Sequence, residues 1–296
     1  MTDIEDKPFR FGVSLFRFTT RDELVDRARQ AERLGYDVVC VPDHLGIFAP
    51  FPALAVAAQA TNRVRLGTFV LNAAFYNPVL LARDAASTDQ LSDGRLELGL
   101  GTGYAKAEFD AAGIPFPGPG ARVDHLRHTV TELRRAFAEA RPAPAQHPAP
   151  PLLLAGHGDR MLRLAAREAD IVGFTGISFT PSGPVLGDAE ELAERVEFVR
   201  EAAGERADEL EFNLLVQRVV VTEDRAAALE ALAREFEGMS AGMSVEKLGQ
   251  LPYLLVGTPE EIAEQVRAHR ARYGIGYFTV FDDHLTDFAG VLDRLR

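Results

Sequence analysis

Short apolar segments of this sequence end in, or are followed by, polar residues and glycines of kinds that bind cofactors or move protons. These residues are Asp43 and His44; Asn72; Gly101, Thr102 and Gly103; Ala155, Gly156, His157, Gly158 and Arg160; and Thr175 and Gly176. If the apolar segments are parallel strands, their carboxyl ends bring these groups to one edge of the fold. Their gathering is a stronger signal than any one of them.

The pair Asp43-His44 suits proton transfer. An imidazole titrates near neutrality, so His44 is the candidate for exchanging a proton with a substrate or contacting a cofactor ring. Asp43 is the candidate for orienting His44 or for hydrogen-bonding its backbone. The alternative is that the two side chains only cap a turn.

Two glycine-rich segments suit a flat, phosphorylated cofactor. The segment from Gly99 to Tyr104 allows the backbone to approach a ring closely, or merely fits a tight turn between strand and helix. The segment from Gly156 to Arg160 begins a predicted helix, whose first N–H groups suit a phosphate, with Arg160 adding charge. The alternative for this second segment is a turn in which Asp159 caps the helix.

We expect no metal site. Asp282, Asp283 and His284 are adjacent, and adjacent residues rarely all face one ion. His125 and His128 stand three residues apart on a predicted helix, a spacing more typical of a solvated face. Cys40, the single cysteine, lies in an apolar run, so we expect a buried thiol and no intramolecular disulfide.

The elements that must position these groups alternate between strand and helix along the whole chain. Strands are predicted at 9–15, 37–41, 64–71, 96–100, 152–155, 171–174, 212–221 and 276–281. Helices are predicted at 22–34 with Thr20 as N-cap, 52–60, 78–91, 123–138, 160–168, 190–203, 225–237, 260–273 and 288–295. The proline-rich stretch 141–151 is expected to be a surface loop, and 238–257 an irregular lid or insertion.

This alternation predicts an α/β fold, a (β/α)8 TIM barrel with insertions, in one domain over residues 1–296. An open, doubly wound sheet is the competing architecture. It is disfavoured because no Gly-x-Gly-x-x-Gly follows the first predicted strand.

Composition narrows the classes of partner. The chain of 296 residues has a formal net charge of −12, which repels phosphate backbones and argues against nucleic acid as a partner. The acidic N-terminal residues 1–6 show no secretory signal, and no run of about 18 apolar residues predicts a membrane span. We therefore expect a cytoplasmic protein without a membrane partner.

Three motifs, taken in order, resemble a known family: Val41-Pro42-Asp43-His44, then Asp93-Gly94-Arg95-Leu96-Glu97-Leu98-Gly99-Leu100-Gly101-Thr102-Gly103, then Ala155-Gly156-His157-Gly158. The chain resembles the luciferase-like flavin or deazaflavin oxidoreductases, and more narrowly their actinobacterial coenzyme F420-dependent branch. The resemblance runs from about Phe9 to Phe281. It implies the barrel fold, and it places Asp43-His44 beside a deazaflavin.

The resemblance implies further details of the site. A non-prolyl cis peptide in a bulge near Asn72 would back the ring, and Gly156 to Arg160, with the loop at Thr175-Gly176, would hold the cofactor phosphate. One departure stands out. The family's sugar-phosphate dehydrogenases carry a glutamate directly after Gly-Thr-Gly, whereas this chain has Tyr104. Sugar-phosphate oxidation is therefore disfavoured, and Glu108 is expected to anchor the following helix.

The preferred interpretation is an F420-dependent oxidoreductase that transfers a hydride between the deazaflavin and a small organic substrate. The alternatives are an FMN-dependent monooxygenase using O2 and a non-catalytic cofactor-binding barrel. The substrate pocket is expected from Gly46 to Phe51, Phe75, Tyr76 and the segment Met239 to Tyr253, whose apolar and aromatic residues suggest an apolar or mixed substrate. The resemblance also implies a homodimer.

Overall fold

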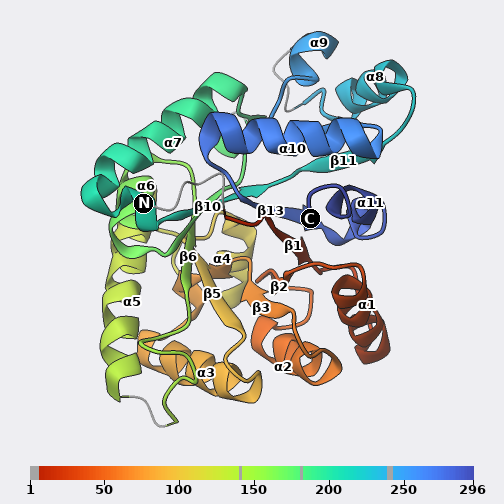
Figure 1. The fold of residues 1–296 in the computed structure, drawn as a ribbon. Helices are drawn as coiled ribbons and strands as arrows, with labels where there is room; N and C mark the ends of the chain where they lie inside the picture. Colours follow the sequence, from red (N-terminus) through yellow and green to blue (C-terminus); the bar gives the residue numbers. More distant parts are fainter. Residues whose placement is uncertain (1–6, 140–141, 181–182, 239–242) are drawn as a thin grey trace.

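A closed parallel barrel forms the centre of the computed structural model, which describes residues 7–139, 142–180, 183–238 and 243–296 (Figure 1). Its strands are β1 (Arg10–Ser14), β2 (Val38–Val41), β3 (Arg65–Thr68), β4 (Leu71–Asn72), β5 (Leu96–Gly101), β6 (Leu152–Ala155), β7 (Ile171–Phe174), β10 (Glu211–Leu215) and β13 (Tyr277–Phe281). They are hydrogen-bonded in the order β3-β2-β1-β13-β10-β7-β6-β5-β4, and a further β3–β5 pairing closes the ring. Because β3 and β4 are two pieces of one predicted strand, the expected (β/α)8 barrel is confirmed.

Helices connect these strands, and most of them surround the barrel (Figure 1). They are α1 (Arg21–Arg33), α2 (Pro50–Ala60), α3 (Pro78–Leu91), α4 (Lys106–Ala112), α5 (Pro119–Glu139), α6 (Asp159–Glu168), α7 (Ala189–Ala203), α8 (Arg225–Glu235), α9 (Val245–Leu248), α10 (Pro259–Tyr273) and α11 (Ala289–Leu292). Thr20 caps α1 as predicted, its side chain accepting a hydrogen bond from the N–H of Glu23. Within the described ranges, no helix is long and apolar enough to span a membrane.

The predicted strand 212–221 is wrong as a single element. It divides into β10, which belongs to the barrel, and β11 (Arg218–Val221), which pairs in parallel with β12 (Leu254–Gly257) outside it. The break falls at the buried Gln217, whose amide donates to the carbonyl of Thr175 at 2.7 Å. A continuous apolar run does not reveal such a division, because both pieces are buried on at least one face.

The segment 238–257 was expected to be irregular, but parts of it are regular. It contains α9 and β12, and its residues share a separate apolar cluster with α8 that includes Leu229, Phe236 and Leu248. Residues 239–242 lie outside the described part of the chain, as do residues 1–6 and Arg141 of the proline-rich loop. Two further elements were not predicted at all: α4, and the hairpin β8 (Ile177–Thr180) and β9 (Gly183–Leu186).

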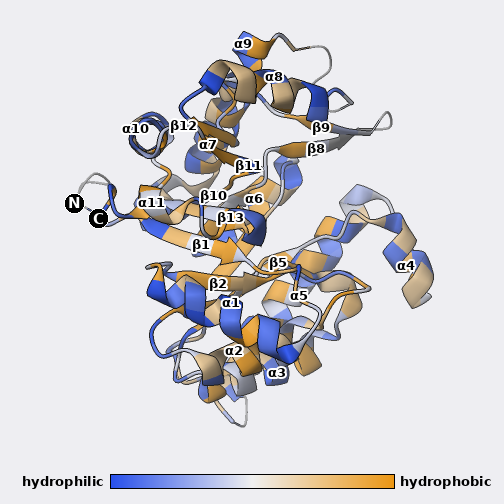
Figure 2. Cartoon of the chain, turned by 90° about the vertical axis from the view of Figure 1, so that its right-hand side faces the viewer, coloured by the Kyte–Doolittle hydropathy of each residue, from blue (hydrophilic) through white to orange (hydrophobic). Residues whose placement is uncertain are grey.

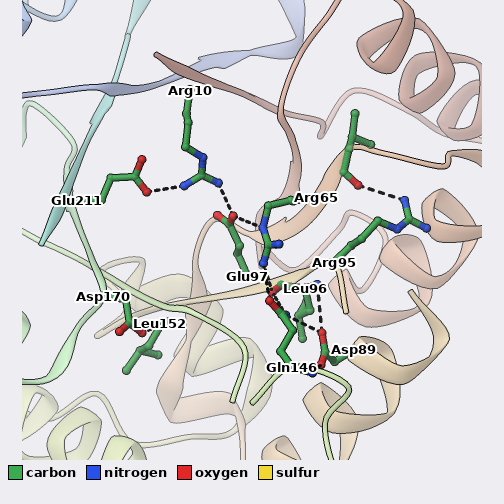
Figure 3. Close-up of polar contacts among 11 residues, drawn as sticks. Arg10, Arg65, Asp89, Arg95, Leu96, Glu97, Gln146, Leu152, Asp170 and Glu211 are labelled. Atoms are coloured by element: carbon green, nitrogen blue, oxygen red, sulfur yellow. Dashed lines mark hydrogen bonds and ion pairs between the residues drawn. The ribbon is translucent and has the colours of Figure 1, made fainter. Parts of the chain in front are cut away.

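An ionic network closes the end of the barrel where the strands begin (Figure 3). The guanidinium of Arg10 bridges the carboxylates of Glu97 and Glu211, and Arg65 also binds Glu97. Glu97 is only 3% exposed, so its charge depends on these two arginines. The amide of Gln146 extends the network by donating to Asp89 at 2.7 Å, which ties the proline-rich loop to α3. Because this network fills the end of the barrel where the strands begin, the candidate site is sought at the opposite end.

Candidate active site

The predicted site residues meet at the carboxyl ends of adjacent barrel strands. Asp43 and His44 follow β2, Asn72 ends β4, Gly101 ends β5, and Gly156 follows β6. The strand order places β2, β3 with β4, β5, β6 and β7 side by side in the barrel wall. On this same side of the barrel, α4 and the hairpin β8–β9 project on the right in Figure 2. The one-rim arrangement expected from the sequence therefore holds for these positions.

His44 has an unexpected partner from α4. Its Nδ1 lies 2.8 Å from Oε1 of Glu108, and the ring of Tyr104 meets the imidazole edge-on with centroids 5.9 Å apart. Glu108 was expected to anchor the helix that follows it, but its carboxylate contacts His44 instead. The N-cap of α4, Ala105, has no side-chain hydrogen bond. Sequence spacing gave no sign of this contact, because 64 positions separate the two residues.

In the described part of the chain, no hydrogen bond joins Asp43 to the ring of His44, which Asp43 was a candidate to orient. Its Oδ2 instead accepts from the backbone N–H of Asn72 at 3.0 Å, and its carboxylate is also hydrogen-bonded to the hydroxyl of Tyr76. Burial raises the pKa of Asp43, against the lowering effect of these two hydrogen bonds and of His44. Asp43 therefore ties the end of β2 to β4.

The bulge expected near Asn72 lies slightly earlier in the chain. The non-prolyl cis peptide joins Phe69 to Val70, in the gap between β3 and β4. Glycines of β5 make room for this detour: a Cβ on Gly99 would lie 2.0 Å from the carbonyl oxygen of Thr68, and one on Gly101 would lie 2.9 Å from Cγ2 of Val70. These glycines are thus required by packing against the bulge, whatever they also do for a ligand.

The next two positions, Thr102 and Gly103, continue the loop after β5. Thr102 is partly exposed. Gly103 has a φ of +71°, and a Cβ there would lie 2.5 Å from Oδ1 of Asn72. Oδ1 of Asn72 also accepts from the N–H of Ala74 at 3.2 Å. The side chain of Asn72 therefore connects the loop after β4 with the loop after β5.

The segment after β6 forms the start of α6. Ala155 is buried in a cluster inside the barrel, whereas Gly158 is the N-cap of α6 and makes no side-chain cap. A Cβ on Gly156 would collide with Cγ of Met161 at 2.5 Å, while one on Gly158 would meet nothing within 4 Å. The alternative in which Asp159 caps the helix is wrong. The first N–H groups of α6 therefore receive no hydrogen bond from the side chain of the N-cap residue.

The charged side chains around this helix start are paired. Arg160 binds Oδ1 of Asp124 at 2.8 Å, Arg195 binds Oδ1 of Asp159 at 2.5 Å, and Nε2 of His157 lies 2.9 Å from Oε1 of Glu191. Arg160 therefore points toward α5. Any phosphate at this place would depend first on backbone N–H groups, with Arg160 adding charge from the side.

The loop after β7 is covered by a residue expected in the substrate pocket. A Cβ on Gly176, whose φ is +72°, would lie 2.2 Å from the ring of Tyr253. Tyr253 is 4% exposed and belongs to the main core, so the expectation that it lines an open pocket is wrong. Thr175 contributes its carbonyl to Gln217, a buried residue that the sequence had not singled out.

Four of the remaining residues expected around a substrate are aromatic, and none of the four is fully buried. Phe48 stacks on Phe18 with centroids 5.2 Å apart and is 42% exposed. Tyr76 meets Phe51 edge-on at 6.3 Å, and Phe75 contacts Phe109 at 5.6 Å. Aromatic side chains thus lie next to Asp43 and α4.

Other candidates from the sequence have structural partners. Oδ2 of Asp282 accepts from the N–H of Arg17 at 3.0 Å, and Asp283 pairs with the Arg17 side chain at 2.8 Å. His125 hydrogen-bonds to the carbonyl of Ala73 at 3.2 Å and so does not face only solvent, whereas His128 is exposed as expected. Among the described residues, no group of three or more His, Cys, Asp and Glu side chains is arranged to hold a metal ion. Cys40 is a buried free thiol, as predicted.

Comparison with known proteins gives one family. Residues 9–276 match the family model described as luciferase-like monooxygenase. A protein of Intrasporangium calvum named F420-dependent glucose-6-phosphate dehydrogenase is 42% identical over 130 residues, which cover 40% of this chain and 39% of that protein. The chain thus spans about two fifths of the length of the first relatives that it matches.

Two other comparisons extend over nearly the whole chain. A protein of Nakamurella multipartita with the same name is 29% identical over 304 residues, covering 88% of this chain and 87% of that protein. The solved structure of an F420-dependent secondary alcohol dehydrogenase in complex with an F420-acetone adduct has a TM-score of 0.76 and 18% identity, covering 98% of each chain. At this identity the structural likeness establishes the fold alone.

Proposed function

The chain belongs to the luciferase-like monooxygenase family, and on that premise we propose that it is an F420-dependent oxidoreductase, which moves a hydride between the deazaflavin and a small organic substrate. The names of its curated relatives support the choice of F420 over FMN. FMN-dependent oxygenation and a non-catalytic barrel are the alternatives that the experiment below distinguishes.

The observation that carries this proposal is the position of His44. Its side chain is 38% exposed at the rim, with Nδ1 engaged by Glu108. Among the residues that the structure describes, Nε2 of His44 has no hydrogen-bond partner. A hydride transfer to or from an oxygen-bearing carbon needs a group that takes or gives a proton, and an imidazole does so near neutral pH.

The donors at the rim fit a phosphorylated, flat cofactor. The uncapped first turn of α6, with an open Gly158, suits the phosphate, and Thr102 and Gly103 are partly exposed in the loop after β5. We propose that Asp43, His44, Asn72, Gly101 to Gly103, Ala155 to Gly158, Arg160, Thr175 and Gly176 surround the cofactor. When bound, a deazaflavin supplies a centre that accepts or donates a hydride.

Binding experiments test the proposal most directly. Purified protein is titrated with F420 and separately with FMN, and binding is followed by calorimetry and by absorbance. We expect saturable binding of F420 with a 1:1 ratio per chain and much weaker binding of FMN. Tight binding of FMN with none of F420 would overturn the proposal in favour of a flavin monooxygenase. Binding of neither by folded protein would favour a non-catalytic barrel.

The aromatic rim and Tyr104 support a proposal for the substrate class. Phe48, Phe51, Phe75 and Tyr76 favour a small substrate of apolar or mixed character. Tyr104 stands where the related sugar-phosphate dehydrogenases carry glutamate, so we propose that a sugar phosphate is not the preferred substrate. We also propose one domain over residues 1–296 and a homodimer, which light scattering checks as a mass of twice 32.3 kDa.

A further inference from the structure

Glu108 is held beside His44 by the packing of α4. Its neighbour Phe109 is fully buried, and the ring of Phe109 contacts Phe75 at 5.6 Å and Phe116 at 4.9 Å. On the outer side of the same helix, Lys106 pairs with Asp110 at 2.6 Å. The aromatic contacts fix the inner face of α4 against the barrel. Glu108, with a side chain 20% exposed, is therefore presented to the rim and not to solvent.

The chemistry of this contact decides which nitrogen of His44 carries the proton. An ionised carboxylate only accepts hydrogen bonds, so the 2.8 Å contact requires Nδ1 of His44 to donate. In the neutral imidazole, the lone pair is then on Nε2. A carboxylate that binds one ring nitrogen in this way both selects the tautomer and fixes the ring orientation.

Glu108 also acts on the other titratable groups around His44. Its charge contributes to raising the pKa values of Asp43 and Tyr104, in both cases after burial, which is the larger cause. Tyr104 lies edge-on to the His44 ring from the loop that leads into α4. His44 is thus bounded by Glu108 on one nitrogen and by Tyr104 on a ring edge.

We propose that Glu108 is a positioning residue that holds His44 as the Nδ1–H tautomer, so that Nε2 is the atom that exchanges a proton with the substrate. This inference rests on the proposed function for the identity of the reaction. For an alcohol as substrate, the C–H bond breaks and its hydride goes to the bound deazaflavin. The O–H bond breaks, its proton goes to Nε2, and a C=O bond forms. Reduction of a carbonyl runs through the same atoms in reverse.

Glu108 also brings a carboxylate to the site although position 104 is a tyrosine. The resemblance gives a glutamate directly after Gly-Thr-Gly in the sugar-phosphate dehydrogenases, and this chain lacks it. A carboxylate nevertheless reaches the site, four residues later and from a helix. It contacts His44, which makes Glu108 a partner of the proton-transfer group.

The first test needs no cofactor and no substrate. Protein labelled with 15N in its imidazoles is studied by NMR at a pH where His44 is neutral. The chain has seven histidines, so the signals of His44 are assigned by comparison with His44→Gln. We expect Nδ1 protonated and Nε2 bare in the wild type and in Glu108→Gln, whose amide oxygen still accepts. We expect Glu108→Ala to shift toward the Nε2–H tautomer. A wild type with Nε2 protonated, or an unchanged tautomer in Glu108→Ala, would overturn the inference.

The second test is kinetic and uses Lys106→Ala as the matched control, since Lys106 lies on the exposed side of the same helix turn. With F420 and an accepted substrate, we expect Glu108→Ala to lower kcat by about 10–100-fold with little change in KM. Glu108→Gln should recover part of that loss, with an altered pH profile of kcat. Full kcat in Glu108→Ala contradicts the inference. A different result separates this inference from the proposed function. If Glu108→Ala loses the tautomer preference but the wild type does not bind F420, the proposed function fails and the positioning contact of Glu108 with His44 stands.

Discussion

Oδ2 of Asp43 accepts a hydrogen bond from the backbone N–H of Asn72 at 3.0 Å, so a carboxylate after β2 holds the end of β4 in place. The hydroxyl of Tyr76 binds the same carboxylate. Burial of Asp43 is nonetheless the largest influence on its pKa, which is raised. Ionisation of Asp43 therefore strengthens these two hydrogen bonds, but the loss of hydration on burial costs the charged carboxylate more than the bonds return.

The first prediction concerns the pH dependence of stability. Because the pKa of Asp43 is raised on folding, its contribution is fully present below its unfolded pKa of about 4 and is lost as pH rises through the folded pKa. Asp43→Asn should therefore gain stability relative to the wild type as pH rises. Asp188, whose pKa is lowered chiefly by the backbone N–H of Glu191, provides a control of opposite sign. Tm values from pH 3 to 8 check both slopes, and parallel slopes for the two variants would contradict the assignment.

The second prediction uses two glycines with the same backbone conformation. Gly103 has a φ of +71° and Gly113 a φ of +67°, but only at Gly103 would a Cβ collide, 2.5 Å from Oδ1 of Asn72. Gly113→Ala should cost about 1–2 kcal/mol, from the left-handed backbone alone. Gly103→Ala should cost about 1–3 kcal/mol more because Asn72 must move. Urea unfolding measures both values, and equal losses would show that Asn72 yields freely.

The third prediction concerns the proposed phosphate site at the start of α6. Arg160 lies in the first turn of that helix, whereas Arg163 lies one turn further along and rests over the ring of Phe198. We expect Arg160→Ala to weaken F420 binding about tenfold, corresponding to about 1.4 kcal/mol, while Arg163→Ala leaves the Kd unchanged. Calorimetry at two salt concentrations measures this. An equal effect of both substitutions would point to general charge and away from a local contact.

The fourth prediction concerns substrate choice. A proton donor placed in the transition state contributes about 10²–10⁴-fold to a rate, and Tyr104 replaces the glutamate that the sugar-phosphate dehydrogenases carry. We expect glucose-6-phosphate to have a kcat/KM at least about 100-fold below that of the best small alcohol or carbonyl compound. Tyr104→Glu should narrow this ratio. If the wild type prefers glucose-6-phosphate, and Tyr104→Glu lowers that activity, the interpretation of Tyr104 is wrong.

Local sequence patterns predicted the barrel well because each βα unit carries its own signal. The helix Pro78–Leu91 and the strands Leu152–Ala155 and Ile171–Phe174 have the bounds that periodicity predicted. The apolar runs 64–71 and 212–221 each predict one strand, but the structure divides each run into two strands. In the first, the division is the bulge at Phe69-Val70. In the second, Arg218–Val221 finds a partner, Leu254–Gly257, that is more than thirty residues away.

The candidate site was predictable only in part, because local patterns do not reveal contacts between distant segments. Their positions after strand ends predicted that Asp43, His44 and Asn72 lie at one rim, since strand order alone brings them together. The contact of Glu108 with His44 depends on the direction in which α4 leaves β5, and that direction is set by the burial of Phe109. Tyr253 was misplaced for the same kind of reason, because its ring fills the space left by Gly176.

The last prediction tests whether the ionic network at the opposite end of the barrel is separate from the site. Glu97 is buried, and Arg10 and Arg65 both bind it (Figure 3). Glu97→Gln keeps the shape of the side chain but leaves two partly buried guanidinium groups without this charge, which should cost about 3–5 kcal/mol. Glu132, in an exposed pair with Arg135 on α5, is the control, and Glu132→Gln should cost about 0.2–1 kcal/mol.

Urea unfolding measures both losses, and the F420 affinity of Glu97→Gln is measured below its transition. That affinity should equal the wild-type value, because the network joins strand beginnings whereas the candidate site follows strand ends. A loss near that of Glu132→Gln would mean that water or Glu211 compensates the two arginines. A large loss of F420 affinity in still-folded Glu97→Gln would mean that the two ends of the barrel are coupled through the strands between them.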